Sequence, residues 1–295
     1  MKKFFYALMA AAAVMTMSCN KTDDPKKDPD DPNNGGGEET GLLVPTYRIK
    51  SYEHSGDVFT YSYNANGTVS VIEASYDGKP YSKFVFAYSG SDLTISDELN
   101  DGELVFEMKL DANNHATYIK NYTKDGAPVY NAKYDKDGFL VYLDVAGVVT
   151  TLQNIEDGCV EYWTRVGIAD KCSADLNADG WRKKMHTYHD ADNIAGIHSE
   201  WDEDAQVKRW VYETGLLGRA SVKVMKTAWW WGTADKEAGV VKDEMAAKLA
   251  YYPLNLAADG TIRTELKLYD TKENYESNPD GMAEDDKYIF TCEKI

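Results

Sequence analysis

Polar and apolar residues alternate along most of this chain, in short runs that are separated by turn residues. Phe84, Phe86 and Tyr88, for example, stand at every second position with smaller or polar residues between them. A period of two places one set of side chains on each face of a β-strand, and aromatic and β-branched residues suit such a half-buried surface. The pattern therefore predicts short strands, each with one face buried.

Turn signals separate these runs at intervals of about 12 residues. Asn-Gly and Asp-Gly pairs tolerate the positive φ angles of tight hairpin turns, so the spacing predicts strands that run up and down in sequence order. The signals are Asn66-Gly67, Asp77-Gly78, Ser89-Gly90, Asp101-Gly102, Asn113-Asn114, Asp125-Gly126, Asp137-Gly138, Ala146-Gly147, Asp157-Gly158, Asp179-Gly180, Asp192-Asn193, Glu203-Asp204 and Asp259-Gly260. We predict an all-β, antiparallel up-and-down meander of roughly 14–16 strands. A sheet that large is expected to close into a barrel or fold into a sandwich, and we expect the barrel.

One segment, residues 233–252, departs from this alternation. Val241, Met245, Leu249 and Tyr252 are spaced three or four residues apart, which places them on one face of a helix. We therefore predict one amphipathic helix at 233–252 that packs against the barrel wall or fills one of its ends.

The N-terminus has the features of a secretory signal. Lys2 and Lys3 precede an apolar run that is too short to span a bilayer, and the run ends at Ser18-Cys19. This junction resembles the cleavage site of bacterial lipoproteins, in which the cysteine becomes the lipid-bearing N-terminus. We predict a signal peptide at 1–18 and lipid attachment at Cys19, with an ordinary secretory signal as the alternative.

Residues 19–41 are rich in proline, glycine and acidic residues, so we expect a solvated tether that buries no core. The acidic stretch Lys21–Asp24 resembles the signal that directs some lipoproteins to the outer face of the outer membrane. The remaining chain, 42–295, is long enough for a single β-barrel domain. The predicted localisation is therefore the outer membrane, lipid-anchored and exposed on the cell surface.

Charge and cysteine content restrict the partners and cofactors. The net charge of −17 is opposite to that of a nucleic-acid-binding surface, so no nucleic acid is expected as a partner. Besides Cys19 the chain has Cys159, Cys172 and Cys292, without a CxxC motif, so no zinc site or other cofactor is expected. A Cys159–Cys172 disulfide is permitted outside the cytoplasm but is not required.

The turns share a finer pattern of a large apolar residue, Asp or Asn, any residue, Asp or Asn, and a Gly-like residue. It occurs at 63–67, 110–114 and 134–138, so the repeating unit is a hairpin of about 24 residues. These turns resemble the tyrosine-aspartate repeats of secreted bacterial shell and toxin proteins. With the N-terminal signal and tether, they also resemble a family of uncharacterised bacterial lipoprotein domains with a porin-like fold. That resemblance implies a fold and no activity.

Charged residues within the predicted strands favour a soluble barrel over a membrane porin. Glu107, Lys109, Lys120 and Lys133 interrupt what would have to be a continuous lipid-facing apolar surface.

The seven tryptophans all lie after residue 162, which makes the second half the candidate binding region. In a strand, Trp229 and Trp231 face one side and Trp230 the other, so one side of this run is either core or an exposed aromatic surface. Exposed rings stack on sugars or anchor protein partners. We expect at least two of Trp229, Trp230 and Trp231 to pack in the core. The candidate ligand-binding residues are Trp229, Trp230, Trp231, Trp201 and Trp210.

Two further patterns are candidate metal sites. Asp175–Gly180 matches the first half of a calcium loop, but the twelfth position is His186 instead of the required Glu, so a simple turn is favoured. A hairpin centred on Asp192 would place His186 opposite His198, as a metal-binding pair or as two solvated histidines.

No sequence motif of a hydrolase, nucleotide-binding protein or metalloprotease is present. We therefore predict a non-catalytic binding protein whose ligand is an extracellular polysaccharide. A scaffold that binds another surface protein is the alternative, and a glycan hydrolase is a third hypothesis.

Overall fold

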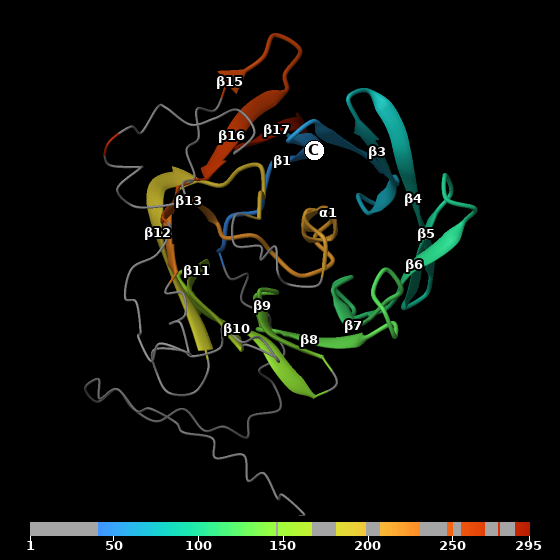
Figure 1. The fold of residues 1–295 in the computed structure, drawn as a ribbon. Helices are drawn as coiled ribbons and strands as arrows, with labels where there is room; N and C mark the ends of the chain where they lie inside the picture. Colours follow the sequence, from blue (N-terminus) through green and yellow to red (C-terminus); the bar gives the residue numbers. More distant parts are fainter. Residues whose placement is uncertain are drawn as a thin grey trace, which may run out of the picture. The chain divides into compact units, whose positions relative to one another are not determined.

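The computed structural model describes residues 41–145, 147–166, 181–198, 207–230, 247–249, 255–268, 277 and 287–295. Strands make up nearly all of the regular structure in these ranges (Figure 1). The strands are β1 (Tyr47–His54), β2 (Asp57–Tyr63), β3 (Val69–Tyr76), β4 (Lys79–Ser89), β5 (Asp92–Asp97), β6 (Glu103–Leu110), β7 (Ala116–Asn121), β8 (Val129–Tyr134), β9 (Leu140–Val145), β10 (Val148–Glu156), β11 (Cys159–Val166), β12 (Trp181–Asp192), β13 (Lys223–Trp230), β14 (Ala247–Leu249), β15 (Asn255–Leu256), β16 (Ile262–Leu268) and β17 (Lys287–Lys294).

The strands form one antiparallel sheet whose pairings run in a ring. Consecutive strands pair from β1 to β14, both β14 and β15 pair with β16, and β17 pairs with β16 and with β1. Between β13 and β16 the described ladder is narrow, because β14 has three residues and β15 two, so the wall is not closed over its full height there. The predicted all-β antiparallel meander is confirmed, and the described part of the chain places 17 strands in its sheet.

The predicted turns join these strands. Asp77 and Gly78 between β3 and β4 both have positive φ angles, 47° and 73°, as the Asp-Gly signal predicts. Because the strands run antiparallel, alternate connections lie at the same rim of the barrel. We call the rim where residues 41–46 lead into β1 the proximal rim. It carries the turns that follow β2, β4, β6, β8 and β10, and the opposite rim is the distal rim.

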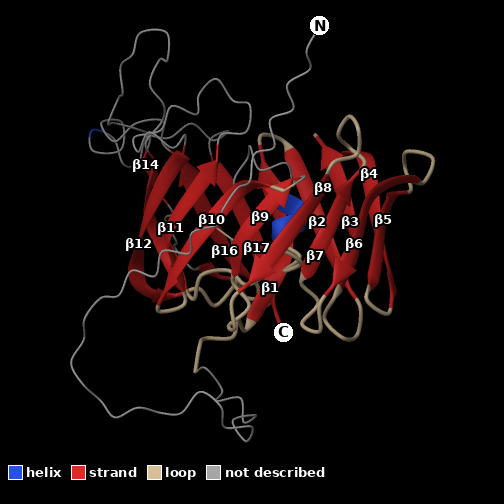
Figure 2. Cartoon of the chain, turned by 90° about the horizontal axis from the view of Figure 1, so that it is seen from below, coloured by secondary structure: helices blue, strands red, loops and turns tan. Residues whose placement is uncertain are grey.

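Alternation along the wall separates a buried inner face from a polar outer face. In β5, Leu93 and Ile95 are buried, whereas Asp92 and Thr94 are exposed. Figure 2 shows the strands side by side as a wall, with the short helix behind the front strands. The charged residues that interrupt the strands thus lie on the outer face, as Lys109 in β6 does.

The connection between β12 and β13 leaves the wall and fills the lumen. We call its described parts, 193–198 and 207–222, the plug, and it contains the helix α1 (Arg209–Tyr212), which lies inside the ring in Figure 1. Trp210 of α1 stacks on Phe84 of β4, with ring centroids 4.3 Å apart, and meets Phe86 and Phe106 at wider angles. Plug and wall therefore share one hydrophobic core.

Two expectations about local structure are wrong. Residues 247–249 of the segment predicted as a helix form strand β14, and 231–246 and 250–252 lie outside the described residues. The sheet is large, so an extended segment that completes its ladder competes with local helix formation. The hairpin expected around Asp192 does not form either, because β12 pairs with β13 and the chain after Asp192 enters the lumen. No helix in the described ranges is long and apolar enough to cross a membrane.

Candidate functional site

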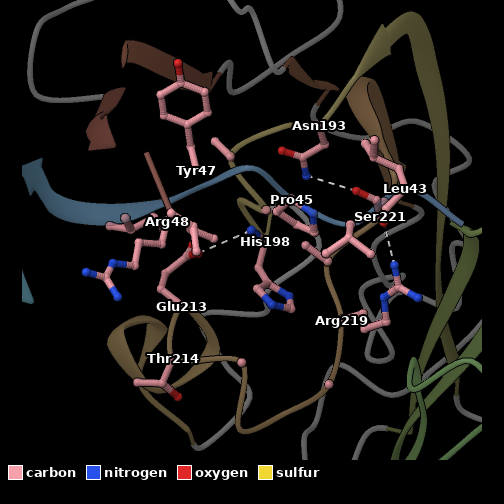
Figure 3. A pocket seen from close by; sticks show the side chains of 18 of the residues that line it. Leu43, Pro45, Tyr47, Arg48, Asn193, His198, Glu213, Thr214, Arg219 and Ser221 are labelled. Carbon is pink, nitrogen blue, oxygen red and sulfur yellow. Dashed lines mark hydrogen bonds between the residues drawn. The ribbon is translucent and has the colours of Figure 1, made fainter. Parts of the chain in front are cut away.

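A cavity of about 360 Å³ lies at the proximal rim, between the plug and the inner side of the barrel (Figure 3). Its lining comes from three parts of the chain: the segment 41–46, which we call the leading segment, the ends of the strands at this rim, and the plug. Specific small-molecule sites have volumes of about 300–1,000 Å³, so this cavity is within the ordinary range.

The leading segment is held against the plug by backbone and side-chain contacts. The guanidinium of Arg219 donates a hydrogen bond of 2.6 Å to the carbonyl of Leu43, and the amide of Thr46 donates one of 3.0 Å to the carbonyl of Ile194. Pro45 lies directly over Gly196, where a Cβ would be only 3.0 Å from the proline ring. The leading segment is thus a fixed wall of the cavity.

Asn193 fixes the first turn of the plug. Its side-chain amide donates to the carbonyls of Ile197 and Ser221, both at 2.9 Å, and its oxygen accepts from the amide of Ile197 at 3.2 Å. The residue is almost fully buried, so these bonds replace water for groups that would otherwise be unsatisfied. They join the two ends of the plug where it enters and leaves the lumen.

Arg48 on β1 is neutralised within the wall. Its guanidinium binds the carboxylate of Glu293 on β17 at 2.7 Å and lies 4.0 Å from the ring centre of Tyr63. The hydroxyl of Tyr63 donates to the carbonyl of Ile49, and burial raises the pKa of Tyr63 above its usual value. Tyr63 is therefore a neutral, rigid part of the lining.

A buried ion pair lies deeper in the lumen. Arg209 and Glu213 are one helical turn apart. The Nη2 atom of Arg209 lies 2.7 Å from Oε1 of Glu213, and the two side chains are only 3% and 0% exposed. Arg209 also donates to the carbonyl of His198 at 2.9 Å, and its guanidinium lies 4.7 Å from the ring centre of Tyr288. Buried charges of this kind need such partners, because removing either one leaves an uncompensated charge.

Two histidines line the cavity, and both favour the neutral form. Burial and the nearby charge of Arg209 lower the pKa of His198 to about 3. Burial also lowers the pKa of His115, with Asp111 acting in the opposite direction. The Nδ1 atom of His115 is buried, and no group in the described part of the chain forms a hydrogen bond with it. At neutral pH the cavity therefore presents uncharged imidazoles.

Arg219 is the cation of this lining that has no carboxylate partner at ion-pair distance among the described residues. It donates instead to the carbonyls of Leu43 and Asp137. In the same ranges, no group of three or more acidic, His or Cys side chains is placed to hold a metal. Among the described residues, the lining thus combines aromatic rings, neutral hydrogen-bonding groups, the paired Arg48 and one cation without a carboxylate partner, which suits a small polar ligand.

Of the five tryptophans predicted to bind a ligand, Trp210 has a described side chain, and it does not line this cavity. Trp229 and Trp230 are the last residues of β13, at the distal rim, and their side chains, with all of Trp231 and Trp201, lie outside the described residues. Trp210 is described and is only 4% exposed. Its ring packs between wall aromatics, so it belongs to the core and presents no face to a ligand.

The histidine pair predicted from the sequence is also not formed. His186 in β12 stands opposite Ala228, and His198 lies in the plug. Their Asp192-centred hairpin was inferred from local turn spacing, which carries no information about a connection that enters the lumen. Cys19, Cys172 and the stretch Asp175–Gly180 lie outside the described residues. Cys159 and Cys292 are both buried.

Sequence reasoning missed the groups that build this site. The Arg209–Glu213 spacing of four residues is a helical signal, but the helix has only four residues and is too short to give a period. Asn193 was assigned to a turn, which is correct, but its buried partners come from residues that are distant in the sequence.

Comparison with known proteins gives a likeness of structure and none of sequence. No family model matches the sequence, and no curated protein matches it. Among solved structures, a porin-like protein from Bacteroides uniformis is similar, with a TM-score of 0.45 and 13% identity, over 86% of this chain and 99% of that chain.

Proposed function

We propose that this protein is a non-catalytic surface lipoprotein, anchored through Cys19, that binds a sugar unit of an extracellular glycan in the cavity at the proximal rim. The observation that carries the proposal is the cavity itself, about 360 Å³ between a rigid plug and the barrel end. The plug is fixed by Asn193 and by the buried ion pair, so the cavity is formed before a ligand arrives. Preorganisation of this kind lowers the entropic cost of binding.

The chemistry of the lining supports a polyhydroxylated ligand. Sugars offer alternating donors and acceptors together with apolar C–H faces. The neutral imidazole of His115 supplies a buried nitrogen whose nearest charged neighbour, the carboxylate of Asp111, is 3.6 Å away, beyond hydrogen-bond distance, and Arg219 supplies a donor. Tyr47 and Tyr63 supply aromatic surface at the rim.

A cavity-filling variant tests this proposal. Ala220 lines the cavity, so Ala220→Trp should occupy the space of a sugar ring. The full mature chain and the variant are compared by affinity electrophoresis against a polysaccharide panel and by calorimetry with the matching oligosaccharides. We expect retardation by at least one glycan for the wild type and a loss of oligosaccharide affinity of about tenfold or more for the variant, which corresponds to about 1.4 kcal/mol.

The matched control is Ala258→Trp, at an exposed turn between β15 and β16 that is not part of the cavity lining. It should bind like the wild type. Unchanged mobility of the wild type in every gel would overturn the glycan proposal. Co-purification with a stoichiometric protein partner in that case would favour the scaffold role. The prediction that Trp229, Trp230, Trp231 and Trp201 contact glycan stays a prediction.

A further inference from the structure

The outer wall across β5, β6 and β7 carries a second hollow, with a volume of about 340 Å³. Its lining includes the outward residues Asp92, Thr94, Glu107, Lys109 and Tyr118. The buried face of the same strands belongs to the core, so this hollow opens to the outside and is separate from the proximal cavity.

Strand register places a row of residues across this hollow. Its first four members are exposed or half-buried on the outer face, and its last member, Asp144, is buried. Asp92 pairs with Lys109, Lys109 with Tyr118, Tyr118 with Asn131, and Asn131 with Asp144, one residue from each of five neighbouring strands. Neighbouring strands are about 4.8 Å apart, so these side chains form a continuous strip that crosses the wall. We call these five residues the outer strip.

At each end of the outer strip, two polar side chains on neighbouring strands bind each other. Lys109 forms an ion pair with Asp92, and the amide of Asn131 donates to the carboxylate of Asp144 at 3.0 Å. Tyr118 stands between these pairs and is half-buried. The strip thus presents one aromatic ring with the exposed Asp92–Lys109 pair on one side and the half-buried Asn131, held by the buried carboxylate of Asp144, on the other.

A second row beside the strip has the same character. Glu107 pairs with Thr94 and with Lys120 across the strands, and its carboxylate accepts a hydrogen bond of 2.6 Å from the hydroxyl of Tyr122. The ammonium of Lys120 lies 4.6 Å from the ring centre of that tyrosine. Charges in both rows are therefore compensated locally, which favours an uncharged partner over an ionic one.

The chemistry of the outer strip excludes other classes of occupant. A lipid-facing wall would not carry Asp92, Lys109 and Glu107 at successive outward positions. A stable protein interface has a core of large apolar residues, and the outward residues of this strip include one aromatic and no aliphatic side chain. A ring with hydrogen-bonding groups on both sides matches the apolar face and the hydroxyl edges of a sugar.

We propose that the outer strip is a binding site for an extended, uncharged glycan chain, with the ring of Tyr118 stacked on a sugar and the paired polar groups bound to its hydroxyls. This proposal rests on the proposed function, because it assumes that the ligand is a glycan. It adds a second site, on a different surface, that takes an internal part of a chain and gives multivalent attachment to a polymer.

The test separates the two sites by substitution. In the full mature chain, Tyr118→Ala should reduce polysaccharide affinity about tenfold or more in affinity gels, because truncating a central aromatic anchor has effects of this order. Tyr118→Phe keeps the ring and should retain most of the affinity. The matched control is Tyr76→Ala, at an exposed tyrosine at the distal end of β3, and it should bind like the wild type.

Calorimetry with a short oligosaccharide distinguishes the failure of each proposal. Tyr118→Ala should leave the affinity of the proximal cavity for a short oligosaccharide unchanged, whereas Ala220→Trp should lower it. If Tyr118→Ala is retarded like the wild type while Ala220→Trp is not, the outer strip proposal is overturned and the proposed function stands. If the wild type binds no glycan at all, the proposed function is overturned and the strip proposal with it. A thermal melt of each variant confirms that the barrel is intact.

Discussion

The wall from β2 to β9 and the plug differ in the origin of their contacts. Each wall strand pairs with its neighbours in the sequence through turns of a few residues. The plug instead packs on residues far away in the chain, as Trp210 does on Phe84. The wall is therefore a repeated local structure, and the plug is a single non-local one that shapes the cavity.

The ion pairs of the two regions differ in their exposure to solvent. Lys83 and Glu98 on the wall are 2.7 Å apart and open to solvent, whereas Arg209 and Glu213 in the plug are 2.7 Å apart and fully enclosed. Water screens the first pair and cannot reach the second. Stability should therefore depend on the plug pair much more than on the wall pair.

The largest effect is expected for Glu213→Ala. It leaves the Arg209 guanidinium buried without a carboxylate and should lower the free energy of unfolding by about 3–5 kcal/mol in urea titrations. The double change Arg209→Met with Glu213→Leu should recover most of this loss, since no charge remains. Lys83→Ala is the matched wall variant and should leave the urea midpoint unchanged. Equal losses for Glu213→Ala and Lys83→Ala would contradict the difference between the two regions.

The two regions also differ in what the sequence predicts. Asp77-Gly78 and the other turns, with the alternation of Phe84 and Phe86, gave the strand order and the inner face of the wall, because hairpin register depends on residues a few positions apart. Nothing local marks Asp192-Asn193 as the point where the chain enters the lumen. The pairs that hold the plug, such as Arg219 with Leu43, join residues that are distant in the sequence.

The prediction of a ligand-binding tryptophan is wrong at Trp210 for the same physical reason. An unusual density of tryptophan drew attention to the second half, but the packing of Trp210 depends on wall residues from the first half. The cavity needs the leading segment, the wall and the plug together. No single stretch of sequence contains its pattern.

A smaller effect is expected where the plug meets the wall. Gly218 has a φ of +92°, and a Cβ there would lie 2.7 Å from the carbonyl oxygen of Gly138 and 3.0 Å from Tyr134. Gly90, in a wall turn, has a φ of +62° and open space around it. Both alanine variants carry backbone strain, but Gly218→Ala also forces the plug away from the turn. It should be destabilised by about 1–3 kcal/mol more than Gly90→Ala.

Chemical denaturation of both glycine variants measures this difference. A chemical-shift map of Gly218→Ala should show changes at the turn between β8 and β9, because the amide of Arg219 donates to the carbonyl of Gly138 there at 2.9 Å. Identical free energies of unfolding for Gly218→Ala and Gly90→Ala would show that the plug is not closely packed on the wall.

The smallest expected effect is a dependence of the free energy of unfolding on pH, which originates in the plug. His198 is buried and its pKa is lowered to about 3, against an unfolded value of about 6.5, so the unfolded state binds the proton first as pH falls. Stability is therefore complete above pH 6.5 and decreases below it, by at most about 1.4 kcal/mol per pH unit for this one group. His198→Gln should flatten the stability curve between pH 7 and pH 5.

His115→Gln at the wall should flatten it less, because the carboxylate of Asp111, 3.6 Å from His115, partly offsets the effect of burial. Urea titrations across this range measure both slopes, and a larger change for His115→Gln would place the pH-sensitive group in the wall instead of the plug.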